Sequence, residues 1–219
     1  MTRYYKAVRP DGTDFHSGAI NYAAALGGGP IALPRVADPR CCTPDVLHAS
    51  DVATETLVGG SWPCRLFLVE GEPVAQKGHK WGFFSLTVVE EIDARLALGP
   101  NADAVIGLID RAANLTVAEA EKLATVRRPA WGAAAVTAGG AARRASRLAA
   151  LDAAWDAAGD AARRAALAST QVPAQVASRG SAEAAAQAAA VRDLIIDEHY
   201  QLLVGPWESV MGTIFPEDE

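Results

Sequence analysis

The residue types best suited to chemistry gather around His48 and Ser50. Both follow a short apolar stretch and precede Val52–Val58, a segment with helical character. A junction between a strand and a helix exposes side chains together with helix amide groups, and such a setting suits the binding of an anion or a nucleotide. A structural alternative fits the same pattern. In it, Ser50 or Asp51 caps the helix, and His48 is a half-buried residue of a sheet.

Two adjacent carboxylates, Glu90 and Glu91, follow the apolar run Phe83–Val89, which predicts a strand. Consecutive side chains of a strand point to opposite faces, so we expect one glutamate to face inward and the other outward. A carboxylate held at a strand end can act as a general base or bind the hydroxyls of a ribose. It can equally supply negative charge to the first turn of a helix that begins near Ile92.

Thiols and imidazoles lie close enough in the sequence to raise the question of a metal site: Cys41, Cys42, Cys64, His48 and His79. Tetrahedral zinc sites usually contain pairs of ligands about two to four residues apart, so that both reach one ion. Here two cysteines are adjacent, and adjacent side chains of a strand diverge. We therefore expect no metal site, and three cysteines without a signal segment are typical of a chain with reduced thiols.

A basic cluster marks the second half of the chain. Residues 120–180 contain nine Lys or Arg against four acids, a local charge of +5 in a chain of net charge −6. Five of these cations fall within one predicted helix, residues 141–168: Arg143, Arg144, Arg147, Arg163 and Arg164. Cations that share a helix face can follow the phosphates of a nucleic acid. The alternative is that they pair with acidic groups of the N-terminal half.

The elements that must position these residues differ between the two halves. In residues 1–93, short runs of aromatic and β-branched residues bounded by Gly and Pro predict a small, mostly antiparallel sheet with short helical connections. The expected strands are Tyr4–Val8, Phe15–Tyr22, Ile31–Leu33, Val46–His48, Arg65–Val69 and Phe83–Val89. The segments 10–13 and 27–30 have the composition of a turn and a loop.

In residues 94–219 the apolar residues recur at helical spacing. Thr116 and Glu119 form a capping box, which predicts a helix that starts there and ends near Pro129. Further helices are expected over residues 141–168 and 181–198. The expected breaks are the Gly139-Gly140 pair and the polar stretch 169–180, and an apolar tail should dock after the last helix, before a solvated acidic end at 217–219.

The chain is thus expected to be an α+β protein with a sheet-rich unit at 1–93 and an alanine-rich helical unit at 94–219. Alanine buries little area per residue, so the helical unit should depend on close packing of helices, within one chain or between chains. No stretch approaches the roughly 18 uninterrupted apolar residues of a membrane helix. The chain starts without the apolar core of a signal peptide, so a cytoplasmic protein is expected.

Short motifs in the first unit resemble a phage-associated domain of unknown function. They are Cys42–Ser50, Arg65–Gly71, Lys80 and the strand that ends in Val88–Ile92. In that family a Cys-x-x-Gly-φ-His-Ala segment precedes an Arg-φ-φ-φ-Val-Glu strand, and alanine-rich sequence follows. This chain has Asp45 or Val46 where the glycine is usual, and Ser50 where a second cysteine is common. The resemblance covers about residues 4–93 and implies a viral or mobile-element origin without an established activity.

The first unit is also similar, at fewer positions, to ADP-ribosyltransferases. Their split sheet carries a His or Arg on an early strand, a small hydroxyl residue on a middle strand and often a Glu on a late strand. His48, Ser50 and either Glu90 or Glu91 match those positions. The resemblance implies NAD held between the two parts of the sheet and transfer of an ADP-ribosyl group.

These patterns favour a non-catalytic phage or mobile-element interaction protein that binds a host or viral macromolecule. We expect a protein partner, or self-association through the alanine-rich helices, and no cofactor. The first alternative is an NAD-dependent enzyme of the ADP-ribosyltransferase type. The second is nucleic-acid binding through the arginine-rich helix. A phage protein of either kind would act in the cytoplasm of its host.

Overall fold

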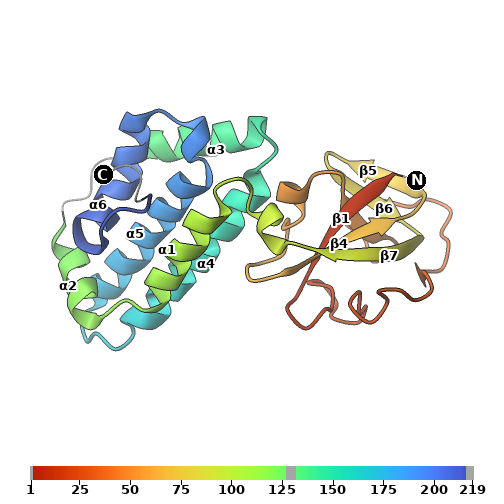
Figure 1. The fold of residues 1–219 in the computed structure, drawn as a ribbon, viewed down its shortest axis with the longest axis horizontal. Helices are drawn as coiled ribbons and strands as arrows, with labels where there is room; N and C mark the ends of the chain where they lie inside the picture. The colour runs from red at the N-terminus through yellow and green to blue at the C-terminus, as the bar shows by residue number, and fades with distance from the viewer. Residues whose placement is uncertain (1, 127–131, 216–219) are drawn as a thin grey trace. The chain divides into compact units, whose positions relative to one another are not determined.

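A computed structural model describes residues 2–126 and 132–215, and it divides the chain into two compact units at 1–97 and 98–219. The first unit contains a seven-stranded antiparallel sheet, and the described residues of the second contain six α-helices (Figure 1). The α+β class, with the sheet first and the helices after it, is as expected from the sequence.

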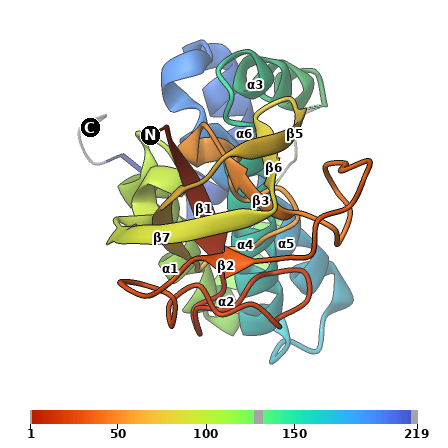
Figure 2. The ribbon, with the colours of Figure 1, turned by 90° about the vertical axis from the view of Figure 1, so that its right-hand side faces the viewer.

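The strands of the first unit are β1 (Arg3–Val8), β2 (Ile31–Ala32), β3 (Leu47–Ser50), β4 (Arg65–Glu70), β5 (Pro73–Lys77), β6 (Lys80–Phe83) and β7 (Ser85–Ile92). Two short 3-10 helices, η1 (Ala53–Glu55) and η2 (Ala94–Ala97), complete it. The strands follow one another across the sheet in the order β2-β7-β4-β1-β3-β6-β5. Figure 2 shows β2 beside β7, and β5 beside β6. The central strand β1 therefore lies between β4 and β3.

The core of the first unit is formed by large side chains on one face of this sheet. Tyr4 and Val8 of β1 pack there with Phe67 of β4 and Phe83 of β6, and all four are buried. The Tyr4 and Phe83 rings meet edge to face with their centroids 4.9 Å apart, a favoured aromatic arrangement. These contacts fix β1, β4 and β6 relative to one another.

The segment Phe15–Tyr22, expected to be a strand, instead forms turns. The buried carboxylate of Asp14 accepts hydrogen bonds from the backbone N–H groups of His16, Ser17 and Ile20, which curls the chain around it. This local alternative to a ladder is typical of aspartate. Thr13 and Asn21 form an isolated antiparallel bridge across this loop.

Two further expectations for the first unit were wrong, and one hairpin was missed. The hairpin of β5 and β6 was not predicted, because β5 is a largely exposed edge strand without a regular alternation of apolar and polar residues. The helix expected at Val52–Val58 is reduced to the single turn η1. Glu90 and Glu91 do not begin a helix, because β7 continues to Ile92.

The helices of the second unit are α1 (Ala102–Ala113), α2 (Val117–Thr125), α3 (Gly132–Arg144), α4 (Leu148–Ala166), α5 (Val172–Ala190) and α6 (Asp197–Met211), with a 3-10 turn, η3 (Arg192–Leu194), before α6. Helix α5 contacts each of the other five helices (Figure 1). All ten residues 181–190 are buried, and eight of them are alanine or serine. A helix enclosed on every side needs small residues all round, and this accounts for the alanine.

The capping box is confirmed, since the Thr116 hydroxyl accepts from the Glu119 N–H and the Glu119 carboxylate accepts from the Thr116 N–H. The predicted end of that helix near Pro129 lies outside the described residues, as does the acidic end at 217–219. The docked tail is seen at Ile214, which is 6% exposed.

The predicted breaks between the later helices were misplaced. Gly139 and Gly140 lie inside α3, because a helix tolerates glycine at a cost of about 1 kcal/mol each. The chain turns instead at Ser146, whose φ of 56° is left-handed. The stretch 169–180 is mostly helical. Pro173 does not prevent this, because it lies in the first turn of α5, where backbone N–H groups form no hydrogen bond within the helix.

The last predicted helix, 181–198, in fact ends with α5 at Ala190, and α6 begins after the η3 turn. Pro206 lies within α6. Among the described helices, none combines the length and the apolar character needed to cross a membrane.

Gly71, between β4 and β5, tests the packing of the sheet. A Cβ there would lie 2.5 Å from the Ser85 carbonyl oxygen, a backbone atom that cannot move aside. We expect Gly71→Ala to lower the free energy of unfolding by about 1–3 kcal/mol in urea titrations. The same change at Gly107 of α1, where no atom lies within 4 Å, should raise it by about 0.5–1 kcal/mol. Equal effects at the two sites would contradict the packing described here.

Candidate functional site

The first unit contains a pocket of about 310 Å³ where the central strands separate. β1 is in register with β4 along all six of its residues, but with β3 at one pair, Tyr5 opposite Ser50. Had the pairing continued, Lys6 would face Ala49 and Ala7 would face His48. Those four residues instead line the pocket. The opening is thus a split in the sheet between β1 and β3.

The loop at 14–17 closes one side of this pocket. Asp14, 7% exposed, accepts four hydrogen bonds of 2.7–3.1 Å, from three backbone N–H groups and from the Ser17 hydroxyl. Burial acts to raise the pKa of Asp14, but the hydrogen bonds from Ser17 and Ile20 and the charge of Lys6 outweigh it and lower the pKa to about 2. Asp14 is therefore a permanently charged anchor that holds His16 at the pocket.

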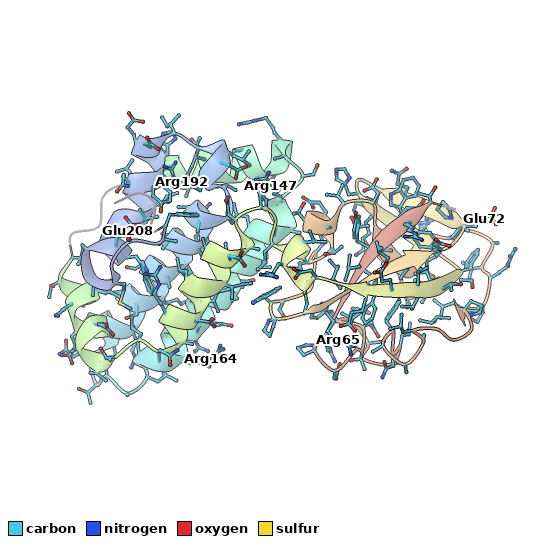
Figure 3. The ribbon with its side chains drawn as sticks, in the orientation of Figure 1. Arg65, Glu72, Arg147, Arg164, Arg192 and Glu208 are labelled. Carbon is cyan, nitrogen blue, oxygen red and sulfur yellow. The ribbon has the colours of Figure 1, made fainter. Side chains whose placement is uncertain are left out.

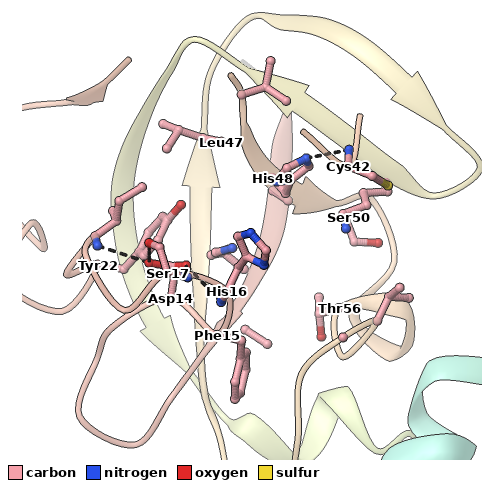
Figure 4. A pocket seen from close by; sticks show the side chains of 18 of the residues that line it. Asp14, Phe15, His16, Ser17, Tyr22, Cys42, Leu47, His48, Ser50 and Thr56 are labelled. Carbon is pink, nitrogen blue, oxygen red and sulfur yellow. Dashed lines mark hydrogen bonds between the residues drawn. The ribbon is translucent and has the colours of Figure 1, made fainter. Parts of the chain in front are cut away.

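His48 of β3 is held as a neutral imidazole. Its Nε2 accepts the Cys42 N–H at 3.0 Å, from a residue in the left-handed conformation with φ 69° (Figure 4). Burial first, and then the charges of Lys80 and Lys6, lower the pKa of His48 to about 4. With Nε2 accepting, the ring proton is on Nδ1. His48 can thus donate a hydrogen bond to a ligand at physiological pH without carrying a charge.

Two lysines give the pocket its positive groups. Lys80 begins β6, opposite Ser50 in the register, and Lys6 lies on β1. Burial, together with the charge of Lys80, lowers the pKa of Lys6 to about 8 against the opposing effect of Asp14. Lys6 also stands over the Tyr22 ring, with Nζ 4.9 Å from the centroid. The fold therefore keeps like charges close together around one cavity.

Hydroxyl and apolar groups complete the lining. The buried Ser50 accepts the Val52 N–H through its Oγ at 3.1 Å and keeps its own proton for donation. Glu55, the last residue of η1, and Thr56, which follows it, also line the pocket. The apolar part of the lining comprises Phe15, Ile20, Leu33, Val46, Leu47 and Val58.

The structure brings His48 and Ser50 together in this pocket, but not Glu90 or Glu91. These two lie on β7, three strands away from β3 in the sheet, and neither lines the pocket. Both are exposed, because the bulge at Leu68/Val69 disrupts the alternation at this end of β7, so the expected inward-facing glutamate is absent. Glu91 forms a two-pronged ion pair with Arg65, with distances of 2.6 and 2.7 Å.

The five arginines singled out by the sequence do not share one helix. Arg143 and Arg144 end α3, Arg147 precedes α4, and Arg163 and Arg164 lie in the last turn of α4. Figure 3 shows Arg147 and Arg164 at opposite ends of α4, which the rise of about 1.5 Å per residue places some 25 Å apart along the axis.

The arginines also differ in their contacts. Arg147 is bound to Asp193 through two contacts of 2.8 Å. The four others are exposed, and they carry positive charge at the C-terminal ends of their helices, where it is favourable. Two further basic residues of the sequence cluster, Arg127 and Arg128, lie outside the described residues.

The thiols and imidazoles of the sequence do not gather into one cluster. Within residues 2–126 and 132–215, no three His, Cys, Asp or Glu side chains come close enough to hold a metal ion. Cys41 donates to the Lys80 carbonyl oxygen at 3.5 Å, and burial raises the pKa of the Cys64 thiol to about 12. His79 pairs instead with Asp51 at 2.8 Å.

Sequence reasoning missed Lys6, Asp14, His16, Glu55 and Lys80 as pocket residues. One signal was present: a lysine between Tyr4 and Val8, at alternate positions of a strand, places an amine on the buried face. Comparison of the chain with models of known protein families, with curated proteins and with solved structures gave no match.

The lowered pKa of His48 predicts a pH-dependent stability. Unfolding restores the ordinary pKa near 6.5, so between pH 6.5 and about 4 the unfolded chain binds a proton that the folded chain does not. Stability should therefore fall as the pH drops through this window, by up to about 3 kcal/mol. His48→Gln, which keeps an acceptor for the Cys42 N–H, should flatten this part of the profile in urea titrations.

His79→Gln, which changes a histidine outside the pocket, serves as the matched control. A profile for His48→Gln as steep as that of the unaltered chain would show that His48 is protonated in the folded state.

Proposed function

We propose that the first unit is a binding module for a small molecule that carries a phosphate group. The observation that supports this best is the pocket itself, whose lining includes Lys6, Lys80, His48 and Ser50. Phosphate oxygens accept hydrogen bonds from ammonium, imidazole N–H and hydroxyl groups, and hydrogen bonds between charged partners are about twice as strong as neutral ones.

The electrostatics of the pocket support an anionic ligand. Lys80 disfavours the charge of Lys6, and both lysines disfavour a charge on His48. The nearby Asp14 already accepts four hydrogen bonds from its own loop. A bound phosphate would relieve the repulsion between the cations, and groups with shifted pKa values in a cleft are typical of functional sites.

The size of the pocket points to a compact ligand. About 310 Å³ is at the lower end of the range for small-molecule sites. A phosphorylated sugar or a mononucleotide fits this volume better than a whole dinucleotide. The apolar wall with Phe15 and Leu47 would cover the uncharged part of the ligand.

This proposal differs from ADP-ribosyl transfer in its chemistry. NAD is the cofactor that the transferase resemblance implies, but Glu90 and Glu91 lie outside the pocket, so the geometry favours binding over transfer by these residues. Within the pocket the carboxylate that could take such a part is Glu55. A macromolecular partner for the helical unit stays a prediction, as does nucleic-acid binding. The alanines of α5 are occupied by its neighbouring helices.

Lys80 offers a sharp test, because Lys77 is its exposed cross-strand neighbour on the same hairpin and does not line the pocket. We expect ribose 5-phosphate and AMP to bind in calorimetric titrations, and ribose and adenosine to bind far more weakly. Lys80→Gln should weaken binding of the phosphorylated probes by about tenfold or more, the effect of one charge-assisted hydrogen bond. Lys77→Gln should leave it unchanged.

Added salt should weaken the binding only moderately, because the cations are partly buried. Equal binding of ribose and ribose 5-phosphate, or equal losses in the two lysine variants, would refute the proposal. NAD belongs in the same series, and tight binding of NAD with no binding of AMP would favour the transferase resemblance instead.

A further inference from the structure

Lys6 occupies an unusual position for a lysine. Alternation along β1 puts it on the same face as Tyr4 and Val8, which are 5% and 0% exposed. Its side chain therefore leaves the strand toward the core, where Nζ lies over the buried Tyr22 ring, and both residues line the pocket. The chain has three other lysines: Lys77 on the edge strand β5, Lys80 at the start of β6 and Lys122 in α2.

The surroundings of Lys6 raise the fraction of neutral amine. Within the described part of the chain no carboxylate forms an ion pair with it, and the oxygens of Asp14 are engaged by their own loop. Burial and the charge of Lys80 lower the pKa of Lys6 to about 8, although Asp14 opposes them. About one tenth of Lys6 is then unprotonated at pH 7, far more than for an ordinary lysine.

Other titratable groups face the same space from each neighbouring element. They are Asp14, His16 and Tyr22 from the N-terminal loops, Tyr5 from β1 itself, Cys42 and His48 from the segment of β3, Glu55 from η1 and Lys80 from β6. An unprotonated amine that a ligand can reach is a nucleophile toward carbonyl groups.

We propose that Lys6 is a nucleophilic amine that forms an imine with a phosphorylated aldehyde or ketone bound in the pocket. The proposal rests on the function proposed above and names the class of its ligand: Lys80 and His48 hold the phosphate, and Lys6 meets the carbonyl carbon. The Nζ lone pair forms the C–N bond, and the carbonyl oxygen becomes a hydroxyl. The hydroxyl then leaves as water, which carries away both protons of the amine, and the C=N bond forms.

The experiment traps this imine on the whole chain. Pyridoxal 5′-phosphate and pyridoxal, which lacks the phosphate, are each added at pH 7 and reduced with borohydride, and the modified lysines are mapped by peptide mass spectrometry. We expect Lys6 to be labelled several-fold more than Lys77, Lys80 and Lys122, and the phosphorylated probe to react at lower concentration. The initial rate should rise with pH and level off above about 8.

Two variants sharpen the result. Lys6→Arg keeps a cation but cannot form the imine, so the dominant label should disappear, whereas Lys77→Arg should leave it in place. If Lys6→Arg fails to fold, the map of labelled lysines in the unaltered chain decides the matter by itself.

The possible outcomes separate the two proposals. Dominant labelling of Lys6 by both probes at the same concentration supports the amine and refutes phosphate recognition by Lys80. Labelling spread evenly over the four lysines, or dominated by Lys77, overturns the role of Lys6. Such labelling would leave phosphate binding standing if AMP and ribose 5-phosphate still bind in the calorimetric titrations, so the two failures are distinguishable.

Discussion

The separation of β1 from β3 is the constraint on which the chemistry of the first unit depends. Paired strands lie about 4.8 Å apart, which leaves no room for a ligand between them. Here the pairing of β1 with β3 stops after Tyr5 and Ser50, while β4 on the other side pairs with β1 along its whole length. The groups exposed by the opening, Lys6 and His48 above all, come from positions that a complete ladder would have enclosed.

Two local sets of hydrogen bonds shape the chain beside this split. Asp14 gathers the backbone of the loop that follows it, and the N–H of Cys42, in a left-handed conformation, fixes the His48 ring. Both use backbone donors that a strand would have directed to its neighbour, so each replaces a ladder bond with a side-chain bond. The pocket wall is therefore made of hydrogen-bonded loops and does not need further strands.

The sequence predicted the elements whose signals are local. The strands at 4–8 and 65–69 have alternating or continuous apolar residues, and Thr116 with Glu119 is a complete capping box, so each could be recognised without tertiary information. His48 and Ser50, which line the pocket, were also singled out, from their place between a short apolar stretch and an expected helix, although that helix is only the turn η1. Asp14 and Lys80 were not found, since each is an ordinary polar residue near a turn until the fold places it beside β3.

The helix boundaries failed for a different reason. Glycine pairs and polar stretches predict breaks, but α3 continues through Gly139 and Gly140 because its packing against α4, α5 and α6 outweighs the cost of about 1 kcal/mol for each glycine. The true break at Ser146 depends on a left-handed residue that no composition rule marks. Local propensity decides where a helix can begin, whereas tertiary burial decides how far it continues.

The two units therefore differ in what their unusual residues imply. In the helical unit, alanine and the buried Gln187 fit a packing role, because Gln187 donates to the Ala135 carbonyl oxygen at 3.1 Å across two helices. In the sheet unit, Lys6, Lys80 and a neutral His48 are held where the lysines disfavour further positive charge. Such an arrangement lowers the stability of the fold, and packing gives no reason for it. The proposed ligand would make use of the three groups together, and the amine of Lys6 would be the most reactive of them.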